Sequence, residues 1–188
     1  MNIPLPNSPL TAADFIIWDA TQTIRYEFVD GRTLEIPDAD DQHNLVRGNI
    51  ALAMKHHLTG TACRVYMSDM KLQVAARQNY FYPDVFVTCS DADRDSKLVK
   101  SEPKLIIEVL SASTAAYDRG EKIANYRAIP TLREYALIDI DKRSADVYRL
   151  GDQGLWVLHP MELAAAGSSL SFASVELTMS AEQLFADI

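Results

Sequence analysis

A single carboxylate interrupts the most apolar segment of this sequence. Glu108 lies within residues 104–110, where every other residue after Lys104 is apolar, so the segment is predicted to be a strand buried on both faces. Because an unpaired charge is costly to bury, a carboxylate here is paired with a cation, protonated or bound to a metal. A buried ion pair with a neighbouring Arg or Lys is the structural alternative to a functional role.

A second acid stands at the start of another apolar segment. Asp84 follows Pro83 near the beginning of the predicted strand 81–88. Taken alone, Asp84 is best explained as a strand-end residue that accepts backbone hydrogen bonds. Together with Glu108, facing the same way on an adjacent strand, it would form an oxygen site suited to Mg²⁺ or Mn²⁺.

The third candidate, Lys122, lies on a helix predicted over residues 118–129. Asp118, Lys122 and Tyr126 are spaced four residues apart, so they share one face of that helix. A surface ion pair between Asp118 and Lys122 explains the lysine as well as a catalytic role does. Asp118 with Glu121 also resembles a capping box, which is a complete structural explanation for Asp118.

A mixed set of strands and helices must position these residues. Periodicity, turn residues and helix caps predict the following order: a helix from Thr11 to Asp19, a hairpin over 24–36 around Asp30-Gly31, a helix from the acidic run 38–41 to Gly60, a hairpin of 62–67 with 70–75 around Ser68-Asp69, strands 81–88 and 104–110, a loop 113–117, a helix 118–129, a hairpin of 134–140 with 145–150, and a strand 155–158. This order predicts a mixed α/β fold with a central sheet and two main helices. The tail after it is poorly patterned.

The composition fits one folded domain, and the charged residues are distributed unevenly along the chain. The 188 residues are 48% apolar and 23% charged, which excludes disorder and low complexity. The net charge of −8 argues against a simple phosphate-binding protein, which should be basic. However, the excess acid lies mostly in 1–42 and 134–188, whereas 43–80 and 97–133 are each net basic.

Other signals limit the location and the chemistry. The two cysteines, Cys63 and Cys89, have no CxxC spacing, which favours a reducing compartment without a disulfide scaffold or zinc site. No basic residue precedes Arg25, and no stretch free of charged residues exceeds 13, so we expect a cytoplasmic protein with no membrane partner. Glycine-rich phosphate loops, the GxSxG elbow and HExxH are absent.

Several short motifs occur together in a characteristic order. They are Tyr26-Glu27-Phe28-Val29-Asp30-Gly31, Gln42-His43, Tyr82-Pro83-Asp84-Val85, Ile107-Glu108-Val109-Leu110-Ser111, Asp118-Arg119-Gly120-Glu121-Lys122 and Glu134-Tyr135-Ala136-Leu137-Ile138-Asp139. In this order, over about residues 26–150, the chain resembles the Uma2 family of restriction-endonuclease-like proteins, part of the PD-(D/E)XK nuclease superfamily.

The resemblance implies a restriction endonuclease-like fold, an α+β arrangement with a central mixed β-sheet flanked by helices. We expect a single domain over residues 1–188, with a family-like core at about 24–150 and a C-terminal hairpin and tail at 151–188. It also implies Mg²⁺- or Mn²⁺-dependent hydrolysis of DNA phosphodiester bonds. Asp84 and Glu108 would be the catalytic acids and the metal ligands.

One position departs from the superfamily pattern. The usual lysine, two residues after the acid, is replaced by Leu110, and the resemblance nominates Lys122 on the following helix as the third catalytic residue. Supporting positions would be Glu27 and His43 at the edge of the site, Asp118 on the lysine helix, and Ser111 after the strand. The ordinary explanations for these four are a hairpin residue, a first-turn helix residue, a helix cap and a turn residue.

Two open questions follow from this departure. A nuclease fold kept as a non-catalytic nucleic-acid-binding or assembly module is the alternative to an active endonuclease, and RNA or another phosphoester is an alternative substrate. A homodimer is expected because two-fold dimers commonly cut both strands of a duplex, with the apolar segment 148–158 as a possible interface.

Overall fold

The computed structural model describes residues 10–188, so the first nine residues of the predicted domain lie outside it. The helices are α1 (Ala12–Asp19), α2 (Asp41–His57), η1 (Ala75–Arg77), α3 (Asp91–Asp95), α4 (Ala115–Tyr117), η2 (Asp118–Lys122), α5 (Ile123–Tyr126), η3 (Ala173–Val175) and α6 (Ala181–Leu184). The strands are β1 (Tyr26–Val29), β2 (Arg32–Glu35), β3 (Arg64–Met67), β4 (Lys71–Val74), β5 (Asn79–Phe81), β6 (Val85–Thr88), β7 (Val99–Lys100), β8 (Pro103–Val109), β9 (Glu134–Asp139), β10 (Ser144–Leu150), β11 (Trp156–Glu162), β12 (Ser169–Phe172) and β13 (Leu177–Ser180).

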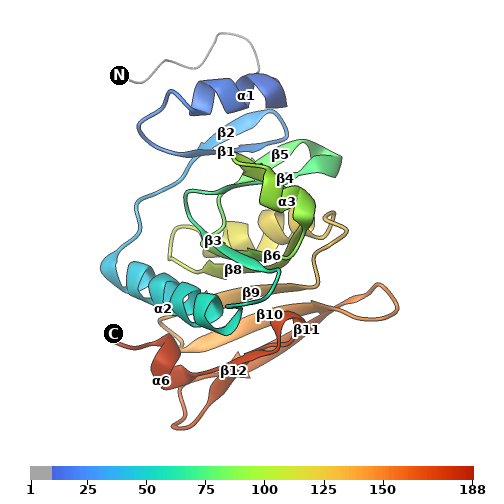
Figure 1. The fold of residues 1–188 in the computed structure, drawn as a ribbon. Helices are drawn as coiled ribbons and strands as arrows, with labels where there is room; N and C mark the ends of the chain where they lie inside the picture. The colour runs from blue at the N-terminus through green and yellow to red at the C-terminus, as the bar shows by residue number, and fades with distance from the viewer. Residues whose placement is uncertain (1–9) are drawn as a thin grey trace.

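Two mixed sheets form the body of the protein. One has the strand order β2-β1-β5-β4-β7 and the other the order β11-β10-β9-β8-β6-β3. Only β4 with β7 and β8 with β9 pair in parallel within these described sheets. Figure 1 shows α1 and the smaller sheet at one end, β12 and α6 at the other, and the larger sheet between them. The predicted mixed fold with flanking helices is confirmed, although the expected central sheet is two sheets.

Several local predictions are also confirmed. Thr11 caps α1 in a capping box with Asp14. The β1–β2 hairpin turns at Asp30 and Gly31, whose φ angles of 48° and 80° are those that a two-residue hairpin turn requires. The β9–β10 hairpin forms as expected, and β8 is almost completely buried.

One long bent hairpin joins the two sheets. Its inner part pairs β4 with β5 around η1, and its outer part pairs β3 with β6 in the larger sheet. At the bend, the Ser68 amide donates to the carbonyls of Pro83 and Asp84 at 3.1 and 3.2 Å. The predicted hairpin between 62–67 and 70–75 is therefore wrong. Ser68-Asp69 bends the strand, and the chain reverses at Gln78, whose φ is 56°.

The same bend breaks the strand predicted over 81–88. The chain leaves the smaller sheet after Phe81 and enters the larger one at Val85. Pro83 lies between them, and proline cannot donate a ladder hydrogen bond. Asp84 therefore stands at the junction of two sheets rather than within a strand.

The helix that carries Lys122 is continuous from α4 through η2 to α5 and contains a π-helical turn at η2. It begins inside the predicted loop 113–117. Asp118 is consequently an interior helix residue, only 2% exposed, and not an N-cap. The capping-box explanation for Asp118 is wrong, because the helix starts a turn earlier than its sequence pattern indicated.

Each face of the larger sheet is covered. On one face Val46, Ile50 and Met54 of α2 are fully buried against β6 and β8. On the other face Ile123 and Tyr126 of α5 join the inner hairpin strands β4 and β5. This packing fixes α2 and α5 on opposite sides of β8, the strand that holds Glu108.

The poorly patterned tail folds against the first of these faces. β12 and β13 form a hairpin, and α6 follows with a capping box at Ser180. Glu134 at the start of β9 is fully buried and accepts hydrogen bonds from the amides of Ala173 and Ser174. This tie depends on residues about 40 positions apart, which local periodicity does not report.

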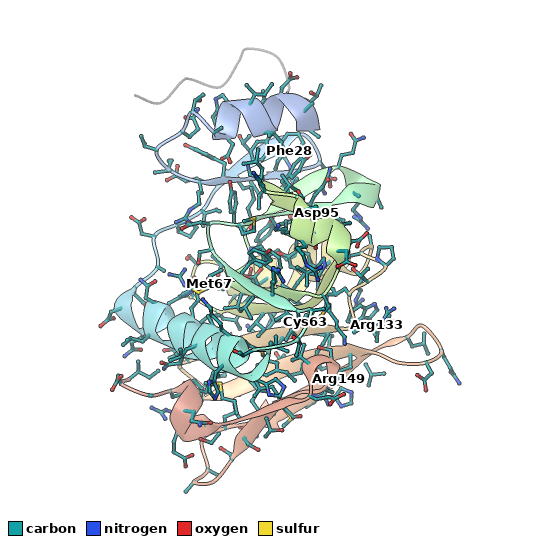
Figure 2. All side chains as sticks on the ribbon, viewed as in Figure 1. Phe28, Cys63, Met67, Asp95, Arg133 and Arg149 are labelled. Atoms are coloured by element: carbon teal, nitrogen blue, oxygen red, sulfur yellow. A yellow bond between two sulfur atoms is a disulfide. The ribbon has the colours of Figure 1, made fainter. Side chains whose placement is uncertain are left out.

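The two cysteines form a disulfide, Cys63–Cys89. Cys63, labelled in Figure 2, precedes β3, and Cys89 follows β6. Because Arg64 of β3 pairs with Thr88 of β6, the next residues outward on the two strands face each other. The expectation that the two cysteines form no disulfide is therefore wrong, and their count no longer supports a reducing compartment. Within residues 10–188 no helix is long and apolar enough to cross a membrane.

Candidate active site

Asp84 and Glu108 are tied together by main-chain hydrogen bonds at the hairpin bend. The Asp84 amide donates to Glu108 Oε2 at 3.1 Å, and the Val109 amide donates to Asp84 Oδ2 at 2.9 Å. Each acid thus receives a hydrogen bond from the backbone at or next to the other acid. The two carboxylates are fixed at similar depth on neighbouring segments, which is the arrangement that an oxygen-ligand cation site needs.

Burial sets the electrostatics of Glu108. The side chain is almost inaccessible, and its Oε1 accepts hydrogen bonds from Lys122 Nζ and the Tyr126 hydroxyl, both at 3.0 Å. Desolvation raises the pKa of Glu108 to about 8, against the opposing charge of Lys122 and with the support of Asp118 and Asp84. Around it, the four carboxyl groups of Glu27, Asp84, Glu108 and Asp118 outnumber the two cations Lys122 and Arg47.

Lys122 reaches the acid pair from the π-helical turn. Its ammonium lies 3.0 Å from Glu108, 3.1 Å from Asp118 and 3.3 Å from Glu27. Glu27 comes from β1 of the smaller sheet and Glu108 from β8 of the larger one. Although burial opposes the charge, these carboxylates raise the pKa of Lys122 well above its usual value, so the lysine remains protonated. One ammonium thus joins both sheets.

Two side chains of α2 approach Asp84 from the opposite side. His43 Nε2 lies 2.8 Å from Asp84 Oδ1, and an Arg47 guanidinium nitrogen lies 3.6 Å from the same oxygen. Burial raises the pKa of Asp84, but the hydrogen bond and charge of His43, with the Val109 amide, outweigh it and leave the pKa below its ordinary value. Asp84 is therefore an ionised carboxylate at neutral pH.

Buried polar atoms without a hydrogen-bond partner gather around this site. Within residues 10–188 five such side-chain atoms occur, and four belong to His43 (Nδ1), Ser68 (Oγ), Tyr117 (Oη) and Asp118 (Oδ1). The Asp118 oxygen is close to Lys122 but lacks hydrogen-bond geometry. Buried polar groups normally have partners, so this concentration indicates a site that water, an ion or substrate completes.

The donor set fits a hard divalent cation. In the part of the chain that the structure describes, no three His, Cys, Asp or Glu side chains are arranged to hold a metal by themselves. Mg²⁺ is usually held by one or two carboxylates, with water and substrate phosphate completing its shell. Asp84 and Glu108 supply that pair, and the surplus negative charge around Glu108 favours a cation.

The structure brings together most of the residues singled out in the sequence. Asp84, Glu108 and Lys122 meet, and Glu27, His43 and Asp118 each contact one of them. Ser111 is the exception, because its hydroxyl bonds to Ser113 and Thr114 at the start of the helix and, among the described residues, forms no hydrogen bond with any of the three.

Sequence reasoning missed Arg47, and Tyr117 was assigned only to a loop. Arg47 lies four residues after His43 on the same helix, a spacing that places both side chains on one face. That spacing was the available signal. Tyr117 gave none, because the start of its helix was placed too late.

The mixed two-sheet fold is that of a restriction-endonuclease-like protein. The fold is similar to a crystal structure from Anabaena variabilis described as a putative nuclease belonging to DUF820, with a TM-score of 0.78, 15% identity, and coverage of 95% of this chain and 98% of that one.

The family model Uma2, described as "Putative restriction endonuclease", matches residues 12–180, and the chain belongs to this family. Two relatives from Synechocystis sp., the uncharacterized proteins slr1290 and sll1609, are each 31% identical to it. The alignments cover 96% and 89% of this chain, respectively, and 95% of each relative.

Proposed function

We propose that this protein is a metal-dependent DNA endonuclease that hydrolyses phosphodiester bonds at the Asp84–Glu108–Lys122 site. The observation that carries the proposal is the 3.0 Å contact between the Lys122 ammonium and Glu108. Leu110 occupies the usual lysine position of the superfamily, and Lys122 brings a cation to the same acid from the following helix. Family membership and the nuclease-like fold support the same reaction class.

Each residue has a distinct role in this proposal. Asp84 and Glu108 would hold Mg²⁺ or Mn²⁺, which polarises the scissile phosphate and lowers the pKa of a bound water. Lys122 keeps Glu108 oriented and places a positive charge near the charge that develops on the phosphate. His43 and Arg47 orient Asp84, while Glu27 and Asp118 hold the lysine in place.

Two further features belong to the proposal. We infer that the protein acts as a homodimer, because two active sites related by a two-fold axis can cut both strands of a duplex. Leu155, Val157 and Leu158 are more than 40% exposed at and beside edge strand β11, and they provide an apolar surface for it. Light scattering that gives the mass of one chain would refute the dimer.

The activity is tested by incubating the purified protein with plasmid DNA in Mg²⁺, in Mn²⁺ and in EDTA. Nicked or linear plasmid is expected with either metal and not in EDTA. Glu108→Gln and Asp84→Asn keep the side-chain shape but remove a ligand charge, so we expect each to slow cleavage at least about 100-fold. Lys142→Gln, an exposed lysine on a surface turn, is the control and should cleave normally.

The outcomes distinguish an active endonuclease from a non-catalytic nucleic-acid-binding module with the same fold. Cleavage that persists in Glu108→Gln, or that never appears with either metal, would refute the endonuclease. The second reading, a non-catalytic nucleic-acid-binding module, is favoured by one observation, the engagement of Lys122 with three carboxylates. It predicts salt-dependent binding without turnover. An RNA substrate in parallel distinguishes the two nucleic acids.

A further inference from the structure

The candidate active site accounts for only some of the basic side chains in residues 43–80, the first net-basic segment of the sequence. Residues 43–80 carry five basic side chains. Lys71 is buried in an ion pair with Asp19 at 2.7 Å, and Arg47 points toward Asp84. Lys55, Arg64 and Arg77 remain, and none of the three forms a salt bridge within residues 10–188. Two of them line the same pocket.

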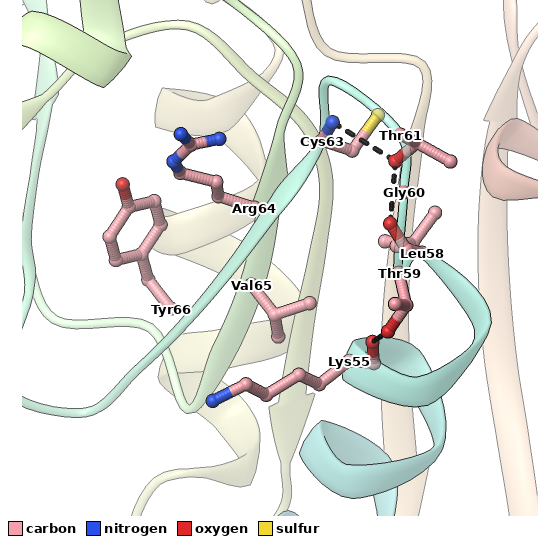
Figure 3. A pocket seen from close by; sticks show the side chains of 9 residues that line it. All are labelled: Lys55, Leu58, Thr59, Gly60, Thr61, Cys63, Arg64, Val65 and Tyr66. Atoms are coloured by element: carbon pink, nitrogen blue, oxygen red, sulfur yellow. Dashed lines mark hydrogen bonds between the residues drawn. The ribbon is translucent and has the colours of Figure 1, made fainter.

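This pocket lies between the C-terminal part of α2 and edge strand β3. It has a volume of about 310 Å³ and is lined by Lys55, Leu58, Thr59, Gly60, Thr61, Cys63, Arg64, Val65 and Tyr66. Figure 3 shows the Lys55 and Arg64 side chains extending from the helix and the strand, with no hydrogen bond to either charged group. The threonine hydroxyls are engaged with α2 carbonyls. The side-chain groups of the pocket that remain available to a ligand are therefore the Lys55 ammonium and the Arg64 guanidinium.

The two elements that form the pocket, α2 and β3, both extend from it toward Asp84 and Glu108. Arg47, beside Asp84, is eight residues before Lys55, which corresponds to about 12 Å along the helix axis. On β3, Met67 pairs with Val85, the residue after Asp84. Arg64 is three residues before Met67, which corresponds to about 10 Å along the strand. Figure 2 places Cys63 and Met67 at the two ends of β3.

This separation matches the spacing of a nucleic-acid backbone. One strand of a duplex carries a phosphate about every 3.4 Å of helix axis, so 10–12 Å corresponds to about three phosphates. Tyr66 also lines the pocket, but its ring is stacked on Phe86 and has the Lys100 ammonium over it, so the pocket offers a strand its cations rather than a stacking surface. A positively charged groove that follows the backbone is the electrostatic part of single-strand binding.

We propose that Lys55 and Arg64 form a second phosphate site, which holds the substrate backbone about three nucleotides from the scissile phosphate. The proposal rests on the nucleic-acid substrate of the proposed function, but not on cleavage. It assigns the pocket to positioning of the strand, with Arg47 between the pocket and the acids.

The test is fluorescence anisotropy with labelled oligonucleotides in Ca²⁺, comparing the wild-type protein with Lys55→Gln/Arg64→Gln. We expect affinity for a strand of roughly 16 nucleotides to fall at least about tenfold, and the logarithmic salt slope to become shallower by about 1.5, since two phosphate contacts are lost. A strand of about three nucleotides cannot reach both sites, so its affinity should change less than twofold.

Matched variants separate local charge from total charge. Arg77→Gln removes an unpaired cation at the hairpin turn of the other sheet and should leave the affinity for the long strand unchanged. Lys55→Arg/Arg64→Lys keeps both charges and should restore it. Circular dichroism checks folding, and if the double variant unfolds, the two single variants replace it, each with about half the change in salt slope.

Two results would overturn the phosphate site. One is equal affinity of the wild-type protein and the double variant for the long strand. The other is an equal loss of affinity in Arg77→Gln. If the wild-type protein cleaves no plasmid in either metal but the double variant still binds the long strand more weakly, the endonuclease proposal fails and the phosphate site stands.

Discussion

Lys122 lies where it can stabilise the fold and where the proposed reaction needs a cation. Its side chain is 10% exposed and lies against carboxylates from β1, β8 and its own helix. A buried cation with three acidic partners stabilises the fold chiefly by preventing the burial of uncompensated charge. The same ammonium is the proposed electrostatic aid to catalysis. Stability and activity measurements on the same variants can separate the two roles.

Lys122→Met is expected to lower the free energy of unfolding by about 3–5 kcal/mol, because Glu27, Glu108 and Asp118 are left without their cation. Urea denaturation measures this change. The matched control is Lys142→Met, whose exposed pair with Asp139 should contribute at most about 1 kcal/mol. Equal effects of the two variants would mean that the Lys122 network carries little of the stability.

The pKa of Glu108 predicts a pH dependence of the metal-free protein. Burial raises this pKa to about 8, above its unfolded value of 4.5, so the folded state binds more protons between these two values. The free energy of unfolding should therefore be greatest at the acidic end of this window, decrease as the pH rises through it, and level off above about 8.

Denaturation of the metal-free protein at several pH values between about 5 and 8.5 checks this slope. Glu108→Gln cannot titrate and should make the slope smaller by the contribution of one proton. A wild-type slope that equals the variant slope would contradict the raised pKa. Metal binding should also release a proton near pH 7, because Glu108 must ionise, and calorimetry in two buffers detects that release.

At the scale of elements, the π-helical turn η2 places both Asp118 and Lys122 toward the acids. Such turns are rare and often occur at functional sites. Gly120 lies at its centre, with a negative φ and no atom within 4 Å of where a Cβ would stand. The glycine is therefore not required by the backbone or by packing.

Gly120→Ala is expected to raise the free energy of unfolding by about 0.5–1 kcal/mol, because alanine costs less backbone entropy in a helix. Gly31→Ala is the contrasting variant, since a φ of +80° strains any L residue and should destabilise the β1–β2 hairpin by a similar amount. Thermal melting measures both. A destabilised Gly120→Ala protein would mean that the turn depends on its glycine.

Local patterns in the sequence identify individual helices, turns and strands better than they identify which of these elements pack or pair with each other. The N-cap of α1, the Asp30-Gly31 turn and the apolar run of β8 involve neighbouring residues, and their predictions are confirmed. The pairing of β3 with β6 and the anchoring of the tail at Glu134 depend on distant residues, so periodicity alone did not find them.

The candidate site follows the same rule. Glu108 was found because a charge within an apolar strand is visible in the sequence. The bend that carries Asp84, and the π turn that aims Lys122, depend on how the two sheets pack. Nothing in the local spacing showed that one ammonium would meet Glu27 and Glu108 together.

For the whole molecule, the net charge of −8 constrains how DNA can bind. In the second net-basic segment, residues 97–133, two of the cations are engaged by other groups of the protein: Lys100 bonds to the carbonyls of Asp93 and Ser96, and Arg119 pairs with Asp139 and Asp146. The acid cluster itself repels phosphate until a cation neutralises it. Binding should therefore be weak and dependent on metal.

Anisotropy with a duplex is expected to show at least about tenfold tighter binding in Ca²⁺ than in EDTA, and a steep loss of affinity with salt. Asp84→Asn should abolish most of the metal effect, since it removes a proposed ligand. A tight complex in EDTA at physiological salt would contradict this account of the charge.

The bent hairpin gives the site a mechanical property. Its two arms each pass from one sheet into the other through the bend, where Asp84 lies and the Ser68 amide donates to the carbonyls of Pro83 and Asp84. Glu27 moves with the smaller sheet and Glu108 with the larger, and Lys122 spans the gap between them. Any sliding of one sheet over the other changes the spacing of the carboxylates. The alignment of the proposed catalytic groups therefore depends on how the two sheets pack against each other.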